Sequence, residues 1–284
     1  MAAADTESGK GLSPARSAAA HAALIVLSVI FLVPLLWLVT SSLKTDDQIF
    51  KFPPEWIPAP LTFANYPAGL TFIPFWRYLL NTTVICVLSV LGTLLSCSLV
   101  AYGLARIRWR GRNVLFYIIL GTMMLPFQVT MVPVFVMFAT IGWVDTFWPL
   151  IAPHFLGNAF FIFLMRQFFL TIPPELTEAA RIDGCSDWGI YRRIIIPLSK
   201  PVLATVGLFA FMAAWNDYLG PLIYLADESK YTLSLGLASF SSQYGSYPGM
   251  LMAVTTVITV PIIAIFFFAQ RTFIQGITLT GIKG

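Results

Sequence analysis

The feature that most constrains this chain is a set of long stretches without Asp, Glu, Lys or Arg, six of which are apolar enough and free enough of proline to form one helix each. These six stretches are 17–43, 78–105, 113–144, 146–165, 201–216 and 231–270. An apolar helix of ~20 residues, rising ~1.5 Å per residue, crosses the ~30 Å hydrocarbon core of a bilayer. Each stretch is about that long, although the fifth reaches this length only by including Asp217.

The composition excludes a soluble domain, and the apolar pattern excludes a β-barrel. Charged residues make up 11% of the chain, whereas a soluble domain carries about 25%. The stretches are continuously apolar rather than alternating, so their backbone hydrogen bonds must close inside helices. The sequence predicts an all-α, polytopic membrane protein with six transmembrane helices. We divide it into an N-terminal tail (1–20), a six-span transmembrane domain (21–269) and a C-terminal tail (270–284).

Basic residues indicate how the spans are oriented. If the N-terminus is inside, thirteen of the 17 Lys and Arg residues fall on the cytoplasmic side. Cytoplasmic loops of membrane proteins are enriched in Lys and Arg, so this asymmetry predicts that both termini are cytoplasmic. The four basic residues left outside are Lys44, Lys51, Arg77 and Lys230.

The longest cytoplasmic insertion, 171–201, predicts a helix, a turn and a second helix. A pair of prolines near its beginning suits a helix start, and Gly184 suits the left-handed residue that follows a helix end. Ser186 can cap the second helix, 187–196, and Pro197 and Pro201 are expected to terminate it.

The first helix of this insertion carries a small apolar surface on a loop that faces water. Leu176, Ala179 and Ala180 share one face by their helical spacing. An apolar surface in that position predicts a partner protein.

Several classes of activity lack their motifs in this chain. There is no GxxxxGK[ST] phosphate loop, so the chain cannot drive itself with ATP. There is no HExxH or GxSxG motif and no facing aspartate pair, as an intramembrane hydrolase would need. Cys86, Cys97 and Cys185 are scattered without the spacing of a disulfide framework or a metal site, so we expect no metal ion.

Asp217 is the most informative single charge. Counted from a span start near Val202, it lies ~22 Å along the helix, inside a ~30 Å core. A carboxylate there costs ~2.5–3.5 kcal/mol, so it should face a polar cavity or a partner. Two interpretations stay open: Asn216 and Asp217 line a substrate path, where they hydrogen-bond to sugar hydroxyls, or Asp217 packs between helices.

The segment EAARIDGCSDWGIYRRIIIP resembles the coupling loop of bacterial ABC importer permeases. That loop has the pattern Glu-Ala-Ala, three residues, Gly, nine residues, Ile, one residue, Leu-Pro, and the one departure here is Ile196 in place of Leu. In the family the loop docks in a cleft of the ATPase, where its acidic residue pairs with a basic one. The residues that the resemblance assigns to ATPase coupling are Glu178, Ala179, Ala180, Gly184, Ile194 and Pro197.

Two further segments, WNDYLGPLIYL from Trp215 and QRTFIQGITLTGIKG from Gln270, look like the second permease subunit of carbohydrate importers related to the maltose system. The resemblance implies a multi-pass permease that translocates a carbohydrate by alternating access across the bacterial cytoplasmic (inner) membrane. It implies a homologous permease subunit, two ATPase subunits that bind ATP and Mg²⁺, and an extracytoplasmic sugar-binding protein as partners.

The resemblance also sets limits. We expect no cofactor on this chain, no catalytic residue and no nucleic-acid partner. A glycerol-phosphate-like phosphoester or a polyol stays open as an alternative substrate. The alternative class, an ion-coupled secondary carrier, calls for several intramembrane carboxylates, and Asp217 stands alone.

The C-terminal tail carries too little apolar surface to fold by itself. Its resemblance to the maltose-type tail implies insertion along the seam between the two ATPase subunits, with Gly281, Lys283 and Gly284 at that contact. The glycines permit close backbone approach, and the lysine can meet carboxylates.

We predict six spans with both termini in the cytoplasm. A cysteine probe placed at Asp46 or Lys230 should react with a reagent added from outside, and a probe at Arg110 or Arg193 should be spared. The positive-inside asymmetry is the reason for this expectation. Labelling in the opposite pattern would exclude both the topology and the docking of the loop to a cytoplasmic ATPase.

Overall fold

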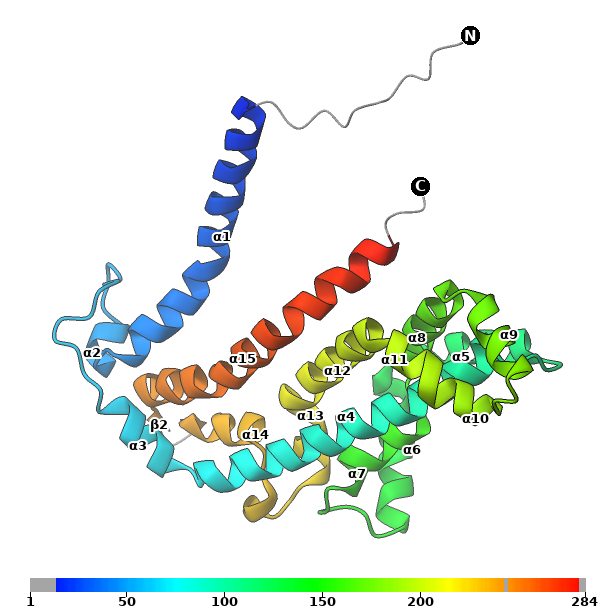
Figure 1. The fold of residues 1–284 in the computed structure, drawn as a ribbon. Helices are drawn as coiled ribbons and strands as arrows, with labels where there is room; N and C mark the ends of the chain where they lie inside the picture. Colours follow the sequence, from blue (N-terminus) through cyan, green and yellow to red (C-terminus); the bar gives the residue numbers. More distant parts are fainter. Residues whose placement is uncertain (1–13, 243–244, 281–284) are drawn as a thin grey trace.

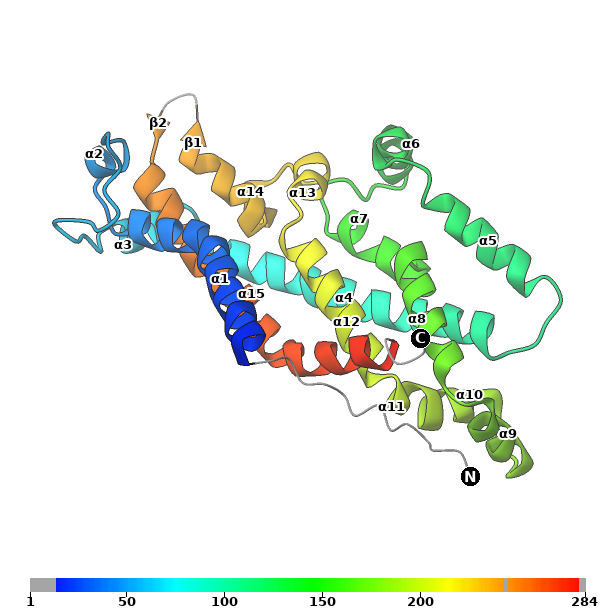
Figure 2. The same cartoon turned by 90° about the horizontal axis from the view of Figure 1, so that it is seen from above.

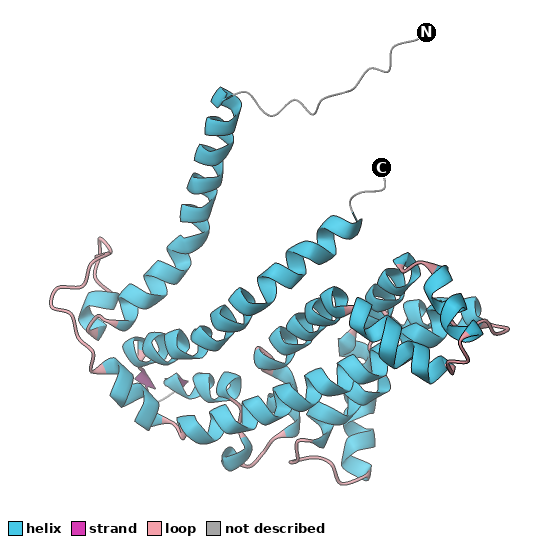
Figure 3. Ribbon diagram, in the orientation of Figure 1, coloured by secondary structure: helices cyan, strands magenta, loops and turns pink. Residues whose placement is uncertain are grey.

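The structure is built almost entirely from helices, as the sequence predicts (Figure 3). The computed structural model describes residues 14–242 and 245–280. Within these residues the strands are two short pieces, β1 (Ser241–Ser242) and β2 (Gly245–Ser246), which pair antiparallel. The all-α class is therefore confirmed.

Long helices alternate with short connecting ones along the chain (Figure 1). The long helices are α1 (Pro14–Ser42), α4 (Phe75–Ala105), α5 (Arg112–Thr122), α6 (Phe127–Thr140), α8 (Ala159–Thr171), α12 (Lys200–Trp215) and α15 (Pro248–Thr280). The short ones are α2 (Asp46–Ile49), α3 (Asn65–Phe72), α7 (Trp148–Ile151), η1 (Ala152–Leu156), α9 (Pro174–Ile182), α10 (Asp187–Ile190), η2 (Tyr191–Ile195), α11 (Ile196–Leu198), α13 (Leu219–Tyr224), η3 (Glu228–Lys230), α14 (Leu233–Leu237) and η4 (Ala238–Phe240).

Four helical segments are long and apolar enough to cross a membrane. They are α1, α4, the run from α7 to α8, and the first part of α15. Two bent pairs also qualify if each counts as one span: α5 with α6, which meet at 96°, and the segment from α10 to α11 with α12, which meet at 79°. The described residues thus hold four to six spans, and the predicted number is the upper one.

The break between α5 and α6 has a local cause. Pro126 is the residue that precedes α6, with an extended backbone at ψ 140°. Proline has no N–H to donate and disfavours a helical conformation in the residue before it. The chain therefore leaves α5 after Thr122 and starts a new helix in a different direction.

Helix α4 lies at the centre of the fold, packed against α8 and α12 (Figure 2). A side chain at Gly92 would come within 2.6 Å of an aromatic ring of η1, so glycine is needed for this close approach. Hydroxyls of α4 also reach neighbouring carbonyls: Ser89 donates to Leu150 O at 3.2 Å, and Ser96 donates to His154 O at 2.8 Å. Small residues and hydroxyls therefore fix α4 against α7 and η1.

Helix α1 contacts the rest of the protein mainly near its C-terminal end, where it meets α15. Its most apolar 18-residue window contains no buried residue, and Figure 1 shows the helix projecting away from the other helices. At the other end, Ser41 and Ser42 are buried, and the Ser42 hydroxyl lies 2.8 Å from the Tyr66 hydroxyl.

One carboxylate ties the connection after α6 to the connection after α13. Asp145 accepts hydrogen bonds from the N–H groups of Ala226 and Asp227 at 3.0 Å each, and it forms an ion pair with Lys230 at 2.6 Å. The bond from the Asp227 N–H, then Lys230 and the Ala226 N–H, lower the pKa of Asp145 from 3.8 to about 2. Because the pKa of Asp145 is lower in the folded protein than in the unfolded chain, its ionised carboxylate stabilises the fold fully above pH 3.8. This stabilisation is lost as the pH falls toward about 2.

We predict that Asp145→Asn lowers the thermal unfolding midpoint of the purified protein at pH 7, because the amide cannot form the ion pair with Lys230. The difference from the unsubstituted protein should narrow as the pH falls from 3.8 toward about 2, because the carboxyl is protonated first in the unfolded chain and only near pH 2 in the folded protein. Differential scanning fluorimetry in detergent measures both effects. Asp47→Asn, at an exposed position in α2, is the control and should change neither. A difference that does not depend on pH would contradict the proposed role of the carboxylate.

Candidate functional site

The segment that resembles a coupling loop folds as two short helices around a tight turn. α9 follows Pro173, whose backbone (φ −54°, ψ 130°) leads into Pro174 in the first turn, where a proline costs no hydrogen bond. Gly184 follows the helix end and adopts φ +78°, the left-handed conformation that glycine favours. The Cys185 N–H donates to Ala180 O at 2.9 Å and closes the helix end.

The second helix starts at a serine cap and widens into a π-helical turn. The Ser186 hydroxyl accepts a hydrogen bond from the Gly189 N–H at 3.2 Å. The second helix ends two residues later than expected, because helical structure continues through η2 and α11 to Leu198 and Pro197 therefore lies inside it. Pro197 lies in the first turn of α11, after the wide π-helical turn, where its missing N–H is tolerated. The chain bends at Ser199 instead.

Glu178 is exposed on α9 and forms no ion pair with any residue that the structure describes. Leu176 and Ile182 are also exposed, at 44% and 87%. Ala180 does not share the expected water-facing surface with Leu176 and Ala179, because it is 5% exposed and packs into the core beneath the loop. The accessible part of α9 thus combines apolar side chains with a free carboxylate.

The other residues of the motif are divided between surface and interior. Ala179, Gly184 and Pro197 are exposed, whereas Ile194 is partly buried against the core cluster. A hollow of about 450 Å³ lies at the turn of the loop and includes Gly184 in its lining. The exposed residues lie on the part of the loop that is open to a partner.

Buried side chains anchor the loop to the membrane helices. Ile190 and Ile195 are completely buried. They belong to the same hydrophobic cluster as Met165 and Phe169 of α8 and several residues of α4. The face of the loop that points toward the membrane is therefore part of the protein core.

Polar contacts fix the same loop to the inner part of α4. The Tyr191 hydroxyl lies 2.7 Å from the Ser98 hydroxyl, and the Tyr102 hydroxyl donates to Asp187 O at 3.0 Å. Across the turn, Arg181 and Asp187 form an ion pair at 3.0 Å. The second helix of the loop is thereby held to α4, and the ion pair joins the first helix to the second.

Asp217 and Asn216 lie where the chain leaves α12 and before it enters α13. Asp217 is partly buried, and its carboxylate accepts a hydrogen bond from the Gly220 N–H at 3.0 Å. Asn216 is exposed, and its amide donates to Met212 O at 2.8 Å. The carboxylate accepts a bond from the first turn of α13, so the chain itself provides one partner for this charge.

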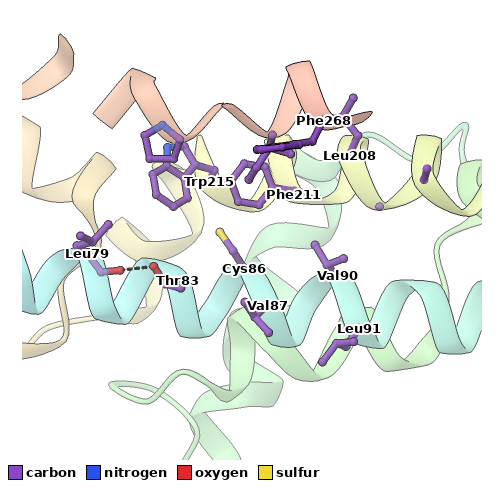
Figure 4. Close-up of a pocket in the computed structure, with 14 residues that line it drawn as sticks. Leu79, Thr83, Cys86, Val87, Val90, Leu91, Leu208, Phe211, Trp215 and Phe268 are labelled. Atoms are coloured by element: carbon purple, nitrogen blue, oxygen red, sulfur yellow. Dashed lines mark hydrogen bonds between the residues drawn. The ribbon is translucent and has the colours of Figure 1, made fainter. Parts of the chain in front are cut away.

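Sequence reasoning missed an apolar groove between α4, α12 and α15 (Figure 4). Its volume is about 780 Å³. Trp215 lines it, and the indole N–H has no hydrogen-bond partner among the residues that the structure describes. Thr83 turns its hydroxyl back to Leu79 O of its own helix at 2.7 Å. Membrane helices are apolar all round, so no periodicity in the sequence separates a groove face from a lipid face.

The remaining predictions concern a metal centre and the C-terminal tail. Within residues 14–242 and 245–280, no group of three His, Cys, Asp or Glu side chains could hold a metal ion. The helical backbone of α15 runs on to Thr280. The predicted tail residues Gly281, Lys283 and Gly284 lie outside the described residues.

Known proteins resemble this chain over most of its length. The Arabinooligosaccharides transport system permease protein AraQ of Bacillus subtilis (strain 168) is 33% identical over 267 residues, which covers 92% of this chain and 93% of AraQ. The Diacetylchitobiose uptake system permease protein NgcG of Streptomyces coelicolor is 32% identical over 262 residues, covering 90% and 85%.

A solved structure shows the same fold. It is a chain of a bacterial ABC transporter involved in the import of the acidic polysaccharide alginate, with a TM-score of 0.79 and 27% identity over 93% of this chain and 99% of that chain. The family described as "Binding-protein-dependent transport system inner membrane component" matches residues 95–279, which include the whole coupling loop. The predicted kinship with ABC importer permeases is confirmed, and the chain belongs to this family of membrane components.

Proposed function

We propose that this chain is the non-catalytic permease subunit of an ATP-driven importer that carries a carbohydrate across the bacterial inner membrane. The observation that carries the proposal is the accessible part of α9, on a loop whose opposite face is buried among membrane helices. The family description supports dependence on a binding protein. Relatives named for oligosaccharides and a polysaccharide support a carbohydrate substrate.

Docking to the ATPase uses the outer side of α9. Glu178 pairs with a basic residue of the ATPase, while Leu176 and Ile182 bury apolar surface against it. Ala179 is small and exposed, so the partner backbone can approach closely at that point. ATP and Mg²⁺ bind to the two ATPase subunits, and this chain contributes the surface that follows their movement.

Movement of the docked loop reaches the membrane through its buried face. Ile190 and Ile195 share one cluster with α4 and α8, and a shift of the loop alone would open a cavity in that close-packed core. The bonds from Tyr102 and Tyr191 add directional contacts. α4 and α8 therefore follow the loop, which opens the path alternately to the two sides of the membrane.

The substrate path includes the break between α12 and α13. Asn216 is exposed there and offers amide groups to sugar hydroxyls, while Asp217 holds the break in shape by capping α13. A phosphoester substrate would favour basic residues, and the segment 201–229, which contains this break, has no Lys or Arg. A saccharide therefore fits this subunit better than a phosphoester.

The subunit works in an assembly with both of its termini in the cytoplasm. Its partners are a homologous permease, two ATPase subunits and an extracytoplasmic sugar-binding protein. Gly281, Lys283 and Gly284 of the tail reach the seam between the two ATPase subunits. The thirteen basic residues on the cytoplasmic side support this orientation.

We predict that Glu178→Lys and Gly184→Leu abolish uptake while the protein stays in the membrane. The first reverses a charge at the ATPase contact and should weaken the binding of the ATPase by ~2–5 kcal/mol, which is a factor of ~30 or more in affinity. The second forces a side chain into φ +78°, which strains the turn. Uptake of labelled oligosaccharide and ATP hydrolysis by the reconstituted complex measure the effect.

A matched control separates docking from a general effect of charge. Glu228→Lys makes the same change in η3, at an exposed position outside the coupling loop, and it should retain uptake. Immunoblots of membrane fractions show whether each variant is inserted. If both loop variants kept substrate-stimulated ATP hydrolysis and transport, the coupling role would be wrong.

We predict that deletion of Thr278 to Gly284 reduces transport and weakens ATPase association but leaves membrane insertion intact. The deletion removes the seam contact and none of the candidate spans. Co-purification of the ATPase with the tagged permease measures association. Undiminished co-purification together with normal uptake would show that the tail is dispensable.

A further inference from the structure

A small basic hollow lies in the turn that joins α4 to α5. Its volume is about 250 Å³. Because α4 and α5 both belong to candidate membrane spans, the turn between them lies at the surface of the bilayer. The lining residues are Arg108, Trp109, Gly111, Arg112, Asn113 and Val114.

Two walls of this hollow are held in place by hydrogen bonds. The indole N–H of Trp109 donates to Gly103 O at 3.1 Å, so the ring is folded back against the end of α4. The Arg112 guanidinium donates to Ile107 O at 3.2 Å, across the turn. The hollow is thus shaped before any ligand arrives, which lowers the entropic cost of binding.

The charge of the turn is not balanced by the protein. Arg108 and Arg110 are exposed, and no ion pair within the described residues involves either of them or Arg112. The chain contains no acidic residue between Glu55 and Asp145. Each guanidinium has five N–H donors. Arg112 uses one of them in its hydrogen bond to Ile107 O, so the others can reach a ligand.

The backbone adds donors on the same side. Gly111 precedes α5 with φ +90° and brings no side chain to cap the helix. The first N–H groups of any helix lack an acceptor within it, and those of Asn113 and Val114 belong to residues that line the hollow. The arginines supply the main attraction, and these N–H groups add to it.

We propose that this hollow binds the phosphate of an anionic phospholipid headgroup. Guanidinium groups pair well with phosphate, and a fixed tryptophan at headgroup level suits the boundary between chains and headgroups. Basic pockets between membrane helices at the bilayer surface are where anionic lipids dock. The lipid holds the α4–α5 turn, and α4 continues from there into the contacts with the coupling loop.

Native mass spectrometry of the purified full chain tests this proposal, with phosphatidylglycerol or phosphatidylcholine of the same acyl chains added. The full chain should retain phosphatidylglycerol, and R108Q/R112Q should bind it about 30-fold more weakly, or about 2 kcal/mol for two arginines. Binding of phosphatidylcholine should be the same for the unsubstituted chain and for R108Q/R112Q. R108K/R112K preserves the charge and should restore most of the affinity.

A second pair of arginines provides the matched control. Arg192 and Arg193 line the hollow of the coupling loop together with the carboxylate of Asp183, so R192Q/R193Q should leave phosphatidylglycerol binding unchanged. Equal lipid binding by R108Q/R112Q and the unsubstituted chain would overturn the proposal. Two other results would do the same: binding of inorganic phosphate in preference to phosphatidylglycerol at equal concentration, or loss of ATPase association in R108Q/R112Q with lipid binding intact.

Discussion

A polar group buried in a membrane helix must find its partner inside the protein, and α4 meets this demand along its whole length. Near its start, the Asn81 amide donates to Ser229 O and Tyr231 O at 3.0 Å each, and the Thr82 hydroxyl accepts from the Leu233 N–H at 2.9 Å. In the middle its hydroxyls reach α7 and η1, and near its end they reach the coupling loop. One helix therefore connects the segment that runs from η3 to α14 with the loop that we propose docks to the ATPase.

This arrangement matters because apolar packing between membrane helices is weakly specific. Lipid tails are as apolar as leucine, so packing, small residues and interhelical hydrogen bonds decide which helices associate, at ~0.6–2 kcal/mol per bond. The bonds of α4 run mostly to backbone carbonyls of other elements, which sets the depth and rotation of the helix relative to them. A subunit that moves as a body between two states needs such fixed contacts.

The sequence predicts those features of the site that depend on local chemistry. Gly184 takes a left-handed conformation and Ser186 caps a helix, because both follow from the residue and its immediate neighbours. Ala180 turns inward because of how the loop packs beneath α4 and α8. Pro197 sits within a helix because the wide π-helical turn precedes it. The apolar groove and the hydrogen-bonded α4–α5 turn also arise from tertiary placement, which no residue pattern in this chain encodes.

The exposed length of α1 allows the insertion of this helix into the membrane to be considered separately from the assembly of the subunit with its partners. Since the most apolar part of this helix buries nothing against its own chain, its insertion is complete once lipid surrounds it, and the other helices form their core without its help. A helix of another subunit that later packs against α1 displaces lipid from it. The free energy of this contact comes from the fit of the two surfaces, because the apolar area of α1 has already left water. Insertion of α1 therefore does not depend on assembly, and the strength of a later helix–helix contact depends on how well the two surfaces fit.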